Sequence, residues 1–102
     1  TPMFETCLTI LCTPSVEEGI QDLLLVMEPS PVFIRQTAAA HGVAFGALSQ
    51  AEQVLGRAAA VEIRVLCDHQ QADEIEERLS ATFGKSGLLM WRTAVAQSGG
   101  QK

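Results

Sequence analysis

Four stretches of the chain are rich in apolar and β-branched residues, a composition typical of strands. We expect these strands at residues 4–12, 32–37, 60–67 and 88–95. In the third, Glu62 and Arg64 alternate with four apolar residues, so we expect Val61, Ile63, Val65 and Cys67 to point inward. Both faces of the first strand are largely apolar, which predicts that both faces are covered.

Two further stretches carry apolar residues at helical spacing. The first follows Thr13 and Pro14, a cap and a first helical residue, and presents one apolar stripe: Val16, Ile20, Leu23, Leu24 and Met27. The second begins after Asp68 as its cap, ends at Gly84, and presents another stripe: Ala72, Ile75, Leu79 and Phe83. Both patterns predict amphipathic helices that pack against a sheet.

The order β-α-β-β-α-β predicts an α+β fold of the ferredoxin-like kind, a four-stranded antiparallel sheet with two helices on one face. We expect one domain over residues 1–102, with a polar tail at 98–102. The helices leave the opposite sheet face bare, and 47% of the residues are hydrophobic. Burial of that face predicts self-association, although the burial argument does not set the number of copies.

The segment at about residues 37–57 joins the second and third strands. Small residues and glycines dominate its first half, and a helical turn is expected from Ser49 to Gly56. A connection of this length in a small domain is usually functional or mobile. The pattern therefore indicates a loop with a role of its own.

The net charge of −5, with only seven Lys and Arg residues, argues against binding to nucleic acid. The sequence has no apolar run near the roughly 18 residues that cross a bilayer, so direct membrane insertion is not expected. Catalytic triads, nucleophile elbows and phosphate-binding fingerprints are also missing from the sequence, so we do not expect an enzyme.

Cysteine occurs three times, at Cys7, Cys12 and Cys67, at spacings that match no zinc motif. The favoured interpretation is small buried residues in a reducing compartment, which predicts a cytoplasmic protein. Metal binding by these thiols, with His41, stays open as an alternative. Cys7 and Cys12 would face opposite sides of one straight strand, which disfavours a shared ion.

A motif at residues 51–57 reads Ala-Glu-Gln-Val-Leu-Gly-Arg and follows His41-Gly42 and Leu48-Ser49. It resembles a signature of an uncharacterised bacterial PII-like family, often encoded beside heavy-metal cation efflux systems. The similarity covers about residues 3–97. PII proteins, carboxysome-associated PII proteins and CutA-like proteins are relatives by architecture.

This resemblance implies a PII-like domain in a homotrimer that binds an adenine nucleotide at the clefts between subunits. The T-loop would be residues 37–57, with His41, Gly42 and Gln53, and would contact a partner such as a membrane transporter. The B-loop would be residues 83–88. The result would be a regulatory protein that needs no cofactor.

The B-loop carries the first set of candidate effector contacts: Gly84, Lys85, Ser86 and Gly87. Glycine amides and a lysine suit a phosphate, whereas the same residues also make an ordinary helix end. Because this turn is shorter than in PII proteins, ADP or AMP are expected beside ATP. Arg57, Arg92 and Arg35 are the second set, expected to gather at one cleft, or else to be solvated surface arginines.

Several side chains keep two interpretations. Trp91 would stack on a base or pack in the trimer core, with the core favoured. Gln53 would bind a ligand or a neighbouring subunit. The alternative functions are a CutA-like metal-responsive protein, with Cys7, Cys12, Cys67 and His41 as ligands, and an adaptor that binds only protein.

Overall fold

The sheet is built around two central strands, β1 (Thr6–Cys12) and β3 (Ala58–Cys67). The structure is a computed structural model that describes residues 4–42 and 58–97. β2 (Val32–Ala40) pairs with the outer side of β3, and β4 (Leu89–Ala94) pairs with the outer side of β1. The strand order is therefore β2-β3-β1-β4, and each neighbouring pair is antiparallel.

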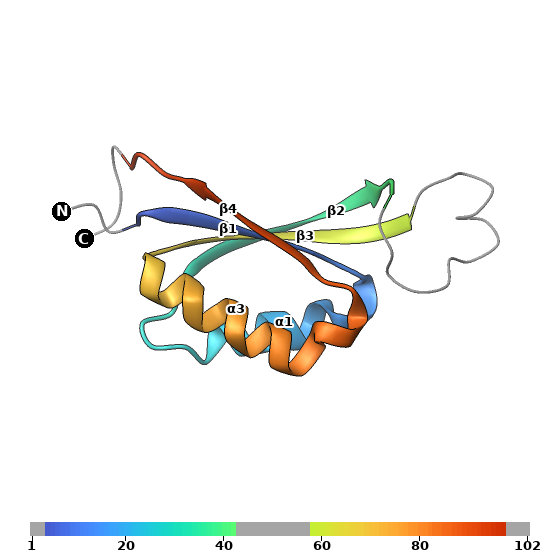
Figure 1. The fold of residues 1–102 in the computed structure, drawn as a ribbon, viewed down its shortest axis with the longest axis horizontal. Coiled ribbons are helices and arrows are strands. Elements are labelled where there is room, and N and C mark those ends of the chain that lie inside the picture. Colours follow the sequence, from blue (N-terminus) through green and yellow to red (C-terminus); the bar gives the residue numbers. More distant parts are fainter. Residues whose placement is uncertain (1–3, 43–57, 98–102) are drawn as a thin grey trace.

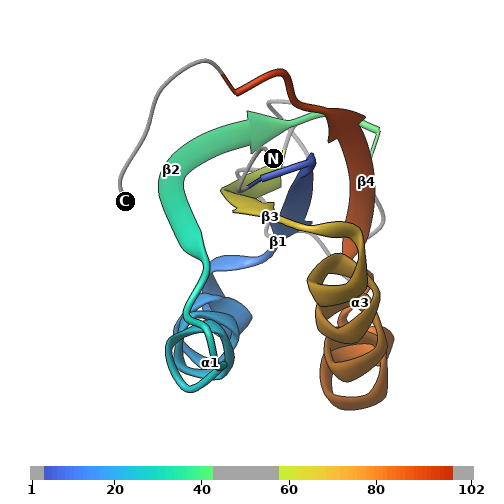
Figure 2. The same cartoon turned by 90° about the vertical axis from the view of Figure 1, so that its left-hand side faces the viewer.

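The two α-helices of the described residues lie side by side on one face of this sheet (Figures 1 and 2). α1 (Pro14–Leu25) starts with Pro14 after Thr13, as the sequence predicts. α3 (His69–Phe83) starts at Asp68, whose Oδ1 accepts a hydrogen bond of 2.7 Å from the Gln71 amide. No helix in the described part of the chain has the length and apolar content that a membrane crossing requires.

The core fills the space between the two helices and the sheet. The predicted inward residues of β3 are buried, whereas Glu62 is half-buried and Arg64 is exposed. Both helical stripes contribute fully buried residues to the same core: Ile20, Leu24, Ala72, Ile75 and Leu79. The alternation of the sequence therefore predicted correctly which sides of β3 and of the helices face inward.

The strand β2 is longer than predicted. It continues past Thr37 to Ala40, and Ala38–Ala40 pair with Ala58–Ala60 of β3. The connection between β2 and β3 therefore begins after Ala40, not at residue 37. The run of alanines was interpreted as the start of a loop because alanine favours strands little. In the structure, ladder pairing along β3 holds these small residues extended.

The outermost predicted residues of two other strands lie outside the sheet. β1 begins at Thr6 rather than Phe4, and β4 covers Leu89–Ala94 rather than 88–95. Backbone hydrogen bonds still fasten the flanking residues, because the Val95 amide donates to the Glu5 carbonyl over 3.2 Å. These differences leave the predicted element order unchanged.

Candidate functional site

The predicted phosphate cradle is a short 3-10 helix that continues α3. It comprises Gly84–Ser86, and Gly87 then takes a left-handed conformation with φ of 76°. The sequence placed the end of α3 at Gly84, and the structure agrees, but Gly84 itself keeps a right-handed conformation. The residue that needs glycine's freedom to turn the chain is Gly87.

Packing against α1 anchors this turn. Phe83, immediately before it, lies over Gly19 in the middle of α1, where a Cβ would come within 2.8 Å of the ring Cζ. The close approach of the two helices at this point therefore depends on a residue without a side chain. It fixes the starting position of the turn.

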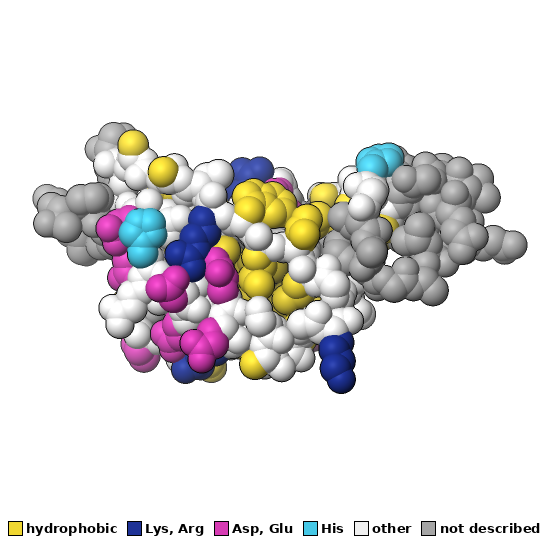
Figure 3. All heavy atoms as spheres, viewed as in Figure 1, with side chains coloured by type: hydrophobic (Ala, Val, Ile, Leu, Met, Phe, Trp, Pro, Cys, Tyr) yellow, Lys and Arg dark blue, Asp and Glu magenta, His cyan; other side chains and the backbone are white. Residues whose placement is uncertain are grey.

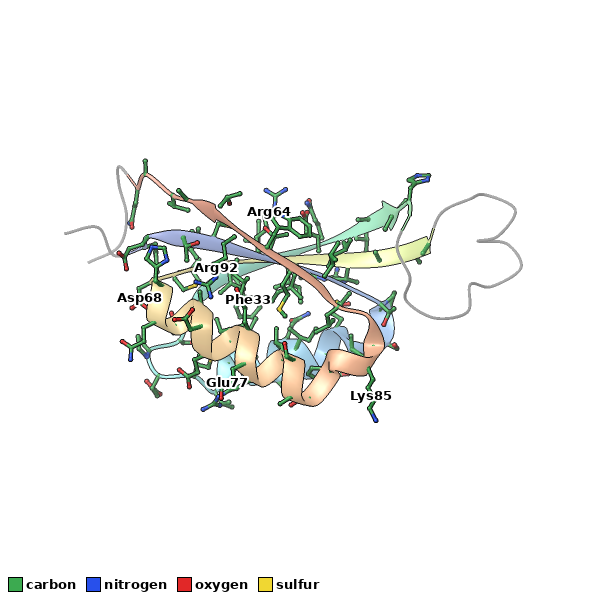
Figure 4. The ribbon with its side chains drawn as sticks, viewed as in Figure 1. Phe33, Arg64, Asp68, Glu77, Lys85 and Arg92 are labelled. Atoms are coloured by element: carbon green, nitrogen blue, oxygen red, sulfur yellow. The ribbon has the colours of Figure 1, made fainter. Side chains whose placement is uncertain are left out.

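Lys85 is exposed on the turn, and its side chain points away from the sheet (Figure 4). It lies at the C-terminal end of α3, where the helix dipole is negative and favours a cation. The Gly84 amide already donates to the Ser80 carbonyl, so an anion at this turn would be attracted by the Lys85 ammonium and repelled by the dipole. Lys85 is thus the residue on which phosphate binding here would depend.

Arg92 of β4 is held by two carboxylates of α3. Its Nε lies 2.6 Å from a Glu76 oxygen, and one terminal nitrogen lies 2.7 Å from Asp73 Oδ1. The hydrogen bonds that Arg92 donates to Glu76 and then to Asp73 raise its pKa above the ordinary value for arginine. In Figure 3, acidic side chains gather over α3, and basic side chains lie among them. The two contacts brace β4 against α3.

Arg35 of β2 is held in the same way by α1. Its guanidinium meets both Glu17 oxygens, with one terminal nitrogen donating over 2.8 Å, and Gln21 donates to the same carboxylate over 2.7 Å. In the sheet register Arg35 is paired with buried Ile63, so its side chain projects from the face of β2 that is turned toward the helices. Each arginine therefore ties an edge strand to a helix.

Arg35 and Arg92 therefore lie apart within one subunit. β2 and β4 are the two edges of the sheet, separated by three strand spacings, or about 14 Å. Arg57 and Gln53 lie outside the described residues. His41 and Gly42 follow the end of β2, with His41 exposed and Gly42 at φ of 75°. Within one subunit, Arg35 and Arg92 are thus each held by a neighbouring helix and not by the turn at Lys85.

The three cysteines are free thiols in separate environments. Cys12 and Cys67 are fully buried in the core, and burial raises the pKa of each to about 11. The Cys12 thiol donates to the Val61 carbonyl, with 3.6 Å between sulfur and oxygen. Cys7 is half-buried on the opposite face of β1. Among the described residues, no three His, Cys, Asp or Glu side chains are placed to hold a metal ion.

The sheet face away from the helices carries a group of side chains that the sequence did not place together, although it singled out Cys7 and Trp91. The ladders align Ile34, Arg64, Thr9 and Trp91 in one row across the four strands. A hollow of about 230 Å³ lies beside this row, lined by Cys7, Val32, Phe33, Ile34, Arg64 and Leu66. Only the strand register, which a single sequence does not reveal, brings these residues together.

A polar cluster lies next to this row on the same face. Glu62 accepts a hydrogen bond from the Gln36 side chain and lies 3.4 Å from a terminal nitrogen of Arg64. Glu62 is half-buried, whereas Ile34 and Trp91 are 57% and 41% exposed. The open face is therefore mostly apolar, with one partly screened ion pair.

Comparison with known proteins gives one family. The sequence profile described as "Protein of unknown function (DUF3240)" matches residues 3–102. No curated protein matches the chain.

Proposed function

Because the chain belongs to the DUF3240 family, whose description leaves its activity open, we propose a function from the fold: a PII-like regulatory protein. It has the ferredoxin-like arrangement, assembles as a homotrimer and binds a small effector between subunits. One observation carries the proposal, namely a sheet of order β2-β3-β1-β4 whose helix-free face is apolar. Two β-α-β halves with this order make the ferredoxin-like arrangement that the resemblance to PII proteins implies.

Burial energetics support the assembly. Large hydrophobic side chains on the helix-free face are exposed to water, including Val32, Ile34, Leu89 and Trp91. Apolar surface gains roughly 25 cal/mol for each Å² that leaves water. Contiguous apolar patches on soluble proteins commonly mark contact surfaces. A second copy of the same chain offers a surface of matching character.

The effector is an adenine nucleotide, ADP, AMP or ATP, and the turn at Gly84–Gly87 is its phosphate contact. Lys85 supplies the positive charge, and the glycines at both ends of the turn allow a close approach to its backbone. Arg35 and Arg92 already bind carboxylates of their own helices. They support the edges of the site, and direct phosphate contact falls to Lys85.

The segment between β2 and β3 is the partner-contacting element of this proposal. It joins two neighbouring strands at one end of the sheet. Effector binding would favour one state of this segment over another, and only the difference in affinity for those states drives the switch. A membrane transporter is the proposed partner, and the cytoplasm the proposed compartment.

Isothermal titration calorimetry with ATP, ADP and AMP tests the nucleotide site. We expect measurable heat with at least one of them and a loss of at least roughly tenfold in affinity for Lys85→Ala, since charge-assisted hydrogen bonds contribute about 1.5–3 kcal/mol. Arg78→Ala is the matched control, because Arg78 is an exposed cation that pairs only with Glu74 on the surface of α3 among the described residues.

Flat titrations with all three nucleotides, for a protein that is folded and assembled, would contradict the nucleotide proposal. Equal losses for Lys85→Ala and Arg78→Ala would place the phosphate elsewhere. Copper, zinc and cobalt belong in the same experiment, because the metal-responsive alternative requires them to bind. The described residues offer no cluster that favours this alternative.

A further inference from the structure

The open sheet face has two unlike edges. Toward β2 lies the hollow of about 230 Å³, walled by Val32 and Ile34 on β2, by Arg64 and Leu66 on β3, and by Cys7 on β1. Toward β4 stands Trp91, a large side chain that is 41% exposed. One edge therefore carries a hollow and the other an exposed indole side chain.

Trp91 does not fill the hollow of its own chain. It is aligned with Thr9 on β1, and Thr9 is aligned with Arg64 on β3, so two strand spacings, or about 10 Å, separate Trp91 from Arg64. Trp91 is also absent from the residues that line the hollow. Both features remain exposed in a single subunit.

The hollow suits an aromatic ring in size and in charge. An apolar cavity of about 150 Å³ is large enough to take benzene, and this hollow is larger. The Arg64 guanidinium lies in its wall, and its side chain is 50% exposed. A guanidinium over the face of an indole is a favourable cation–π pair, and a thiol such as Cys7 also packs well against aromatic rings.

We propose that Trp91 of one copy of the chain docks in the Arg64-lined hollow of the next copy. This inference rests on the homotrimer proposed above and names the contact that holds it together. Because the inserted side chain and the hollow lie at opposite edges of the face, each copy gives one and receives one. Such a heterologous contact closes into a ring when the rotation between copies fits.

The electrostatic match makes the docking selective. The ring face of Trp91 carries negative quadrupole charge toward Arg64, whose nearest described carboxylate, Glu62, stays at 3.4 Å. The guanidinium therefore keeps its ion pair and gains a second partner when the indole arrives. Large aromatic residues in desolvated pockets are the usual centres of binding energy at interfaces.

Trp91 is also a built-in probe, since the chain has one Trp and no Tyr. We expect emission typical of a buried indole in the assembled protein, and a shift to longer wavelength on dilution below the assembly range. Light scattering over a concentration series should show Trp91→Ala weakening association by roughly 30-fold or more per contact. Arg64→Leu should weaken it by roughly 2- to 30-fold.

The matched control is Val26→Ala, because Val26 is 72% exposed but lies at the end of α1, away from the open face. Ile34→Glu alters the other side of the contact, because it places a charge in the hollow that would receive Trp91. The Ile34 side chain is 57% exposed, so the fold should tolerate the change. It should dissociate the assembly as Trp91→Ala does. In the Trp91→Ala and Ile34→Glu variants, Cys7 should react with a thiol reagent faster than in the parent.

Assembly of Trp91→Ala at the parent's strength, or solvent-exposed emission from the assembled parent, would overturn this docking while leaving the proposed trimer intact. A parent protein that stays a single subunit at every concentration would overturn the docking and the trimer together. Dissociation by Trp91→Ala and Ile34→Glu, but not by Val26→Ala, is the result that supports it.

Discussion

Replacing Gly19 with Ala tests the contact that positions the predicted phosphate turn. Gly19 lies inside α1, and Phe83 at the end of α3 approaches it so closely that a Cβ would be 2.8 Å from Cζ and 3.2 Å from Cε1. Two effects with opposite sign follow. Alanine stabilises a helix interior relative to glycine, whereas its methyl group collides with the ring.

The magnitudes come from the geometry. The change from Gly to Ala favours a helix by about 0.8–1 kcal/mol. Carbon atoms pack best at about 3.5–4.0 Å, so the Phe83 ring must move by roughly 1 Å. Overpacking of this kind costs about 1–3 kcal/mol, with the lower cost if the half-buried ring shifts outward. Gly19→Ala should therefore be neutral or destabilising by up to about 2 kcal/mol.

Phe83→Leu isolates the collision, because leucine lacks the ring atoms that approach Gly19. In that background Gly19→Ala should stabilise the protein by about 1 kcal/mol, a coupling of about 1–3 kcal/mol between the two sites. Urea unfolding at one fixed protein concentration measures all four proteins. If Gly19→Ala stabilises the parent and the Phe83→Leu variant equally, the close packing of α1 on α3 described above is wrong.

Three further predictions follow from the core and the edges. Burial raises the pKa of Cys12 and of Cys67 from 9.0 to about 11, so the unfolded chain loses these protons first as pH rises. The contribution of these two thiols to stability should be constant below about pH 9 and fall toward pH 11. Replacing both cysteines with Ala should flatten that alkaline decline, as urea midpoints across pH would show. Leu79→Ala removes a fully buried side chain and should cost about 2–5 kcal/mol in urea unfolding, whereas its exposed neighbour Ser80→Ala should stay within about 0.5 kcal/mol. Equal effects at the two positions would contradict the assigned helix face. Arg92→Ala should lower the melting temperature, and high salt should shrink the difference from the parent because salt screens exposed ion pairs. A difference that salt leaves unchanged would mean that the contact with α3 is not electrostatic.

The alternation of residues along the chain was enough to predict the order of elements and the faces that meet the core. Cys67 and Val65 point inward on β3 because period-two alternation leaves one side of a strand apolar. Asp68 was recognisable as a cap because short polar side chains satisfy the free amides of a first helical turn. Such local rules do not set where a strand ends, and β2 continues to Ala40 because β3 pairs with it.

Side-chain partners across the fold were beyond a sequence interpretation. Within one subunit, strand order places Arg35 and Arg92 at opposite edges, where Glu17, Asp73 and Glu76 bind them. Their meeting at a cleft between subunits stays a prediction. The row from Ile34 to Trp91 depends on three registers at once. Register follows from long-range pairing, which the spacing of residues within one strand does not reveal.

The most direct test of this account is the mass of the intact protein in solution, measured by light scattering behind a size-exclusion column. Burial of the open sheet face against other copies predicts a mass above the 10.9 kDa of one chain, and the proposed homotrimer sets it at three times that mass. A stable species of 10.9 kDa at working concentration would contradict it, because a lone subunit would keep Trp91 and Ile34 in water and would have no cleft between subunits for an effector.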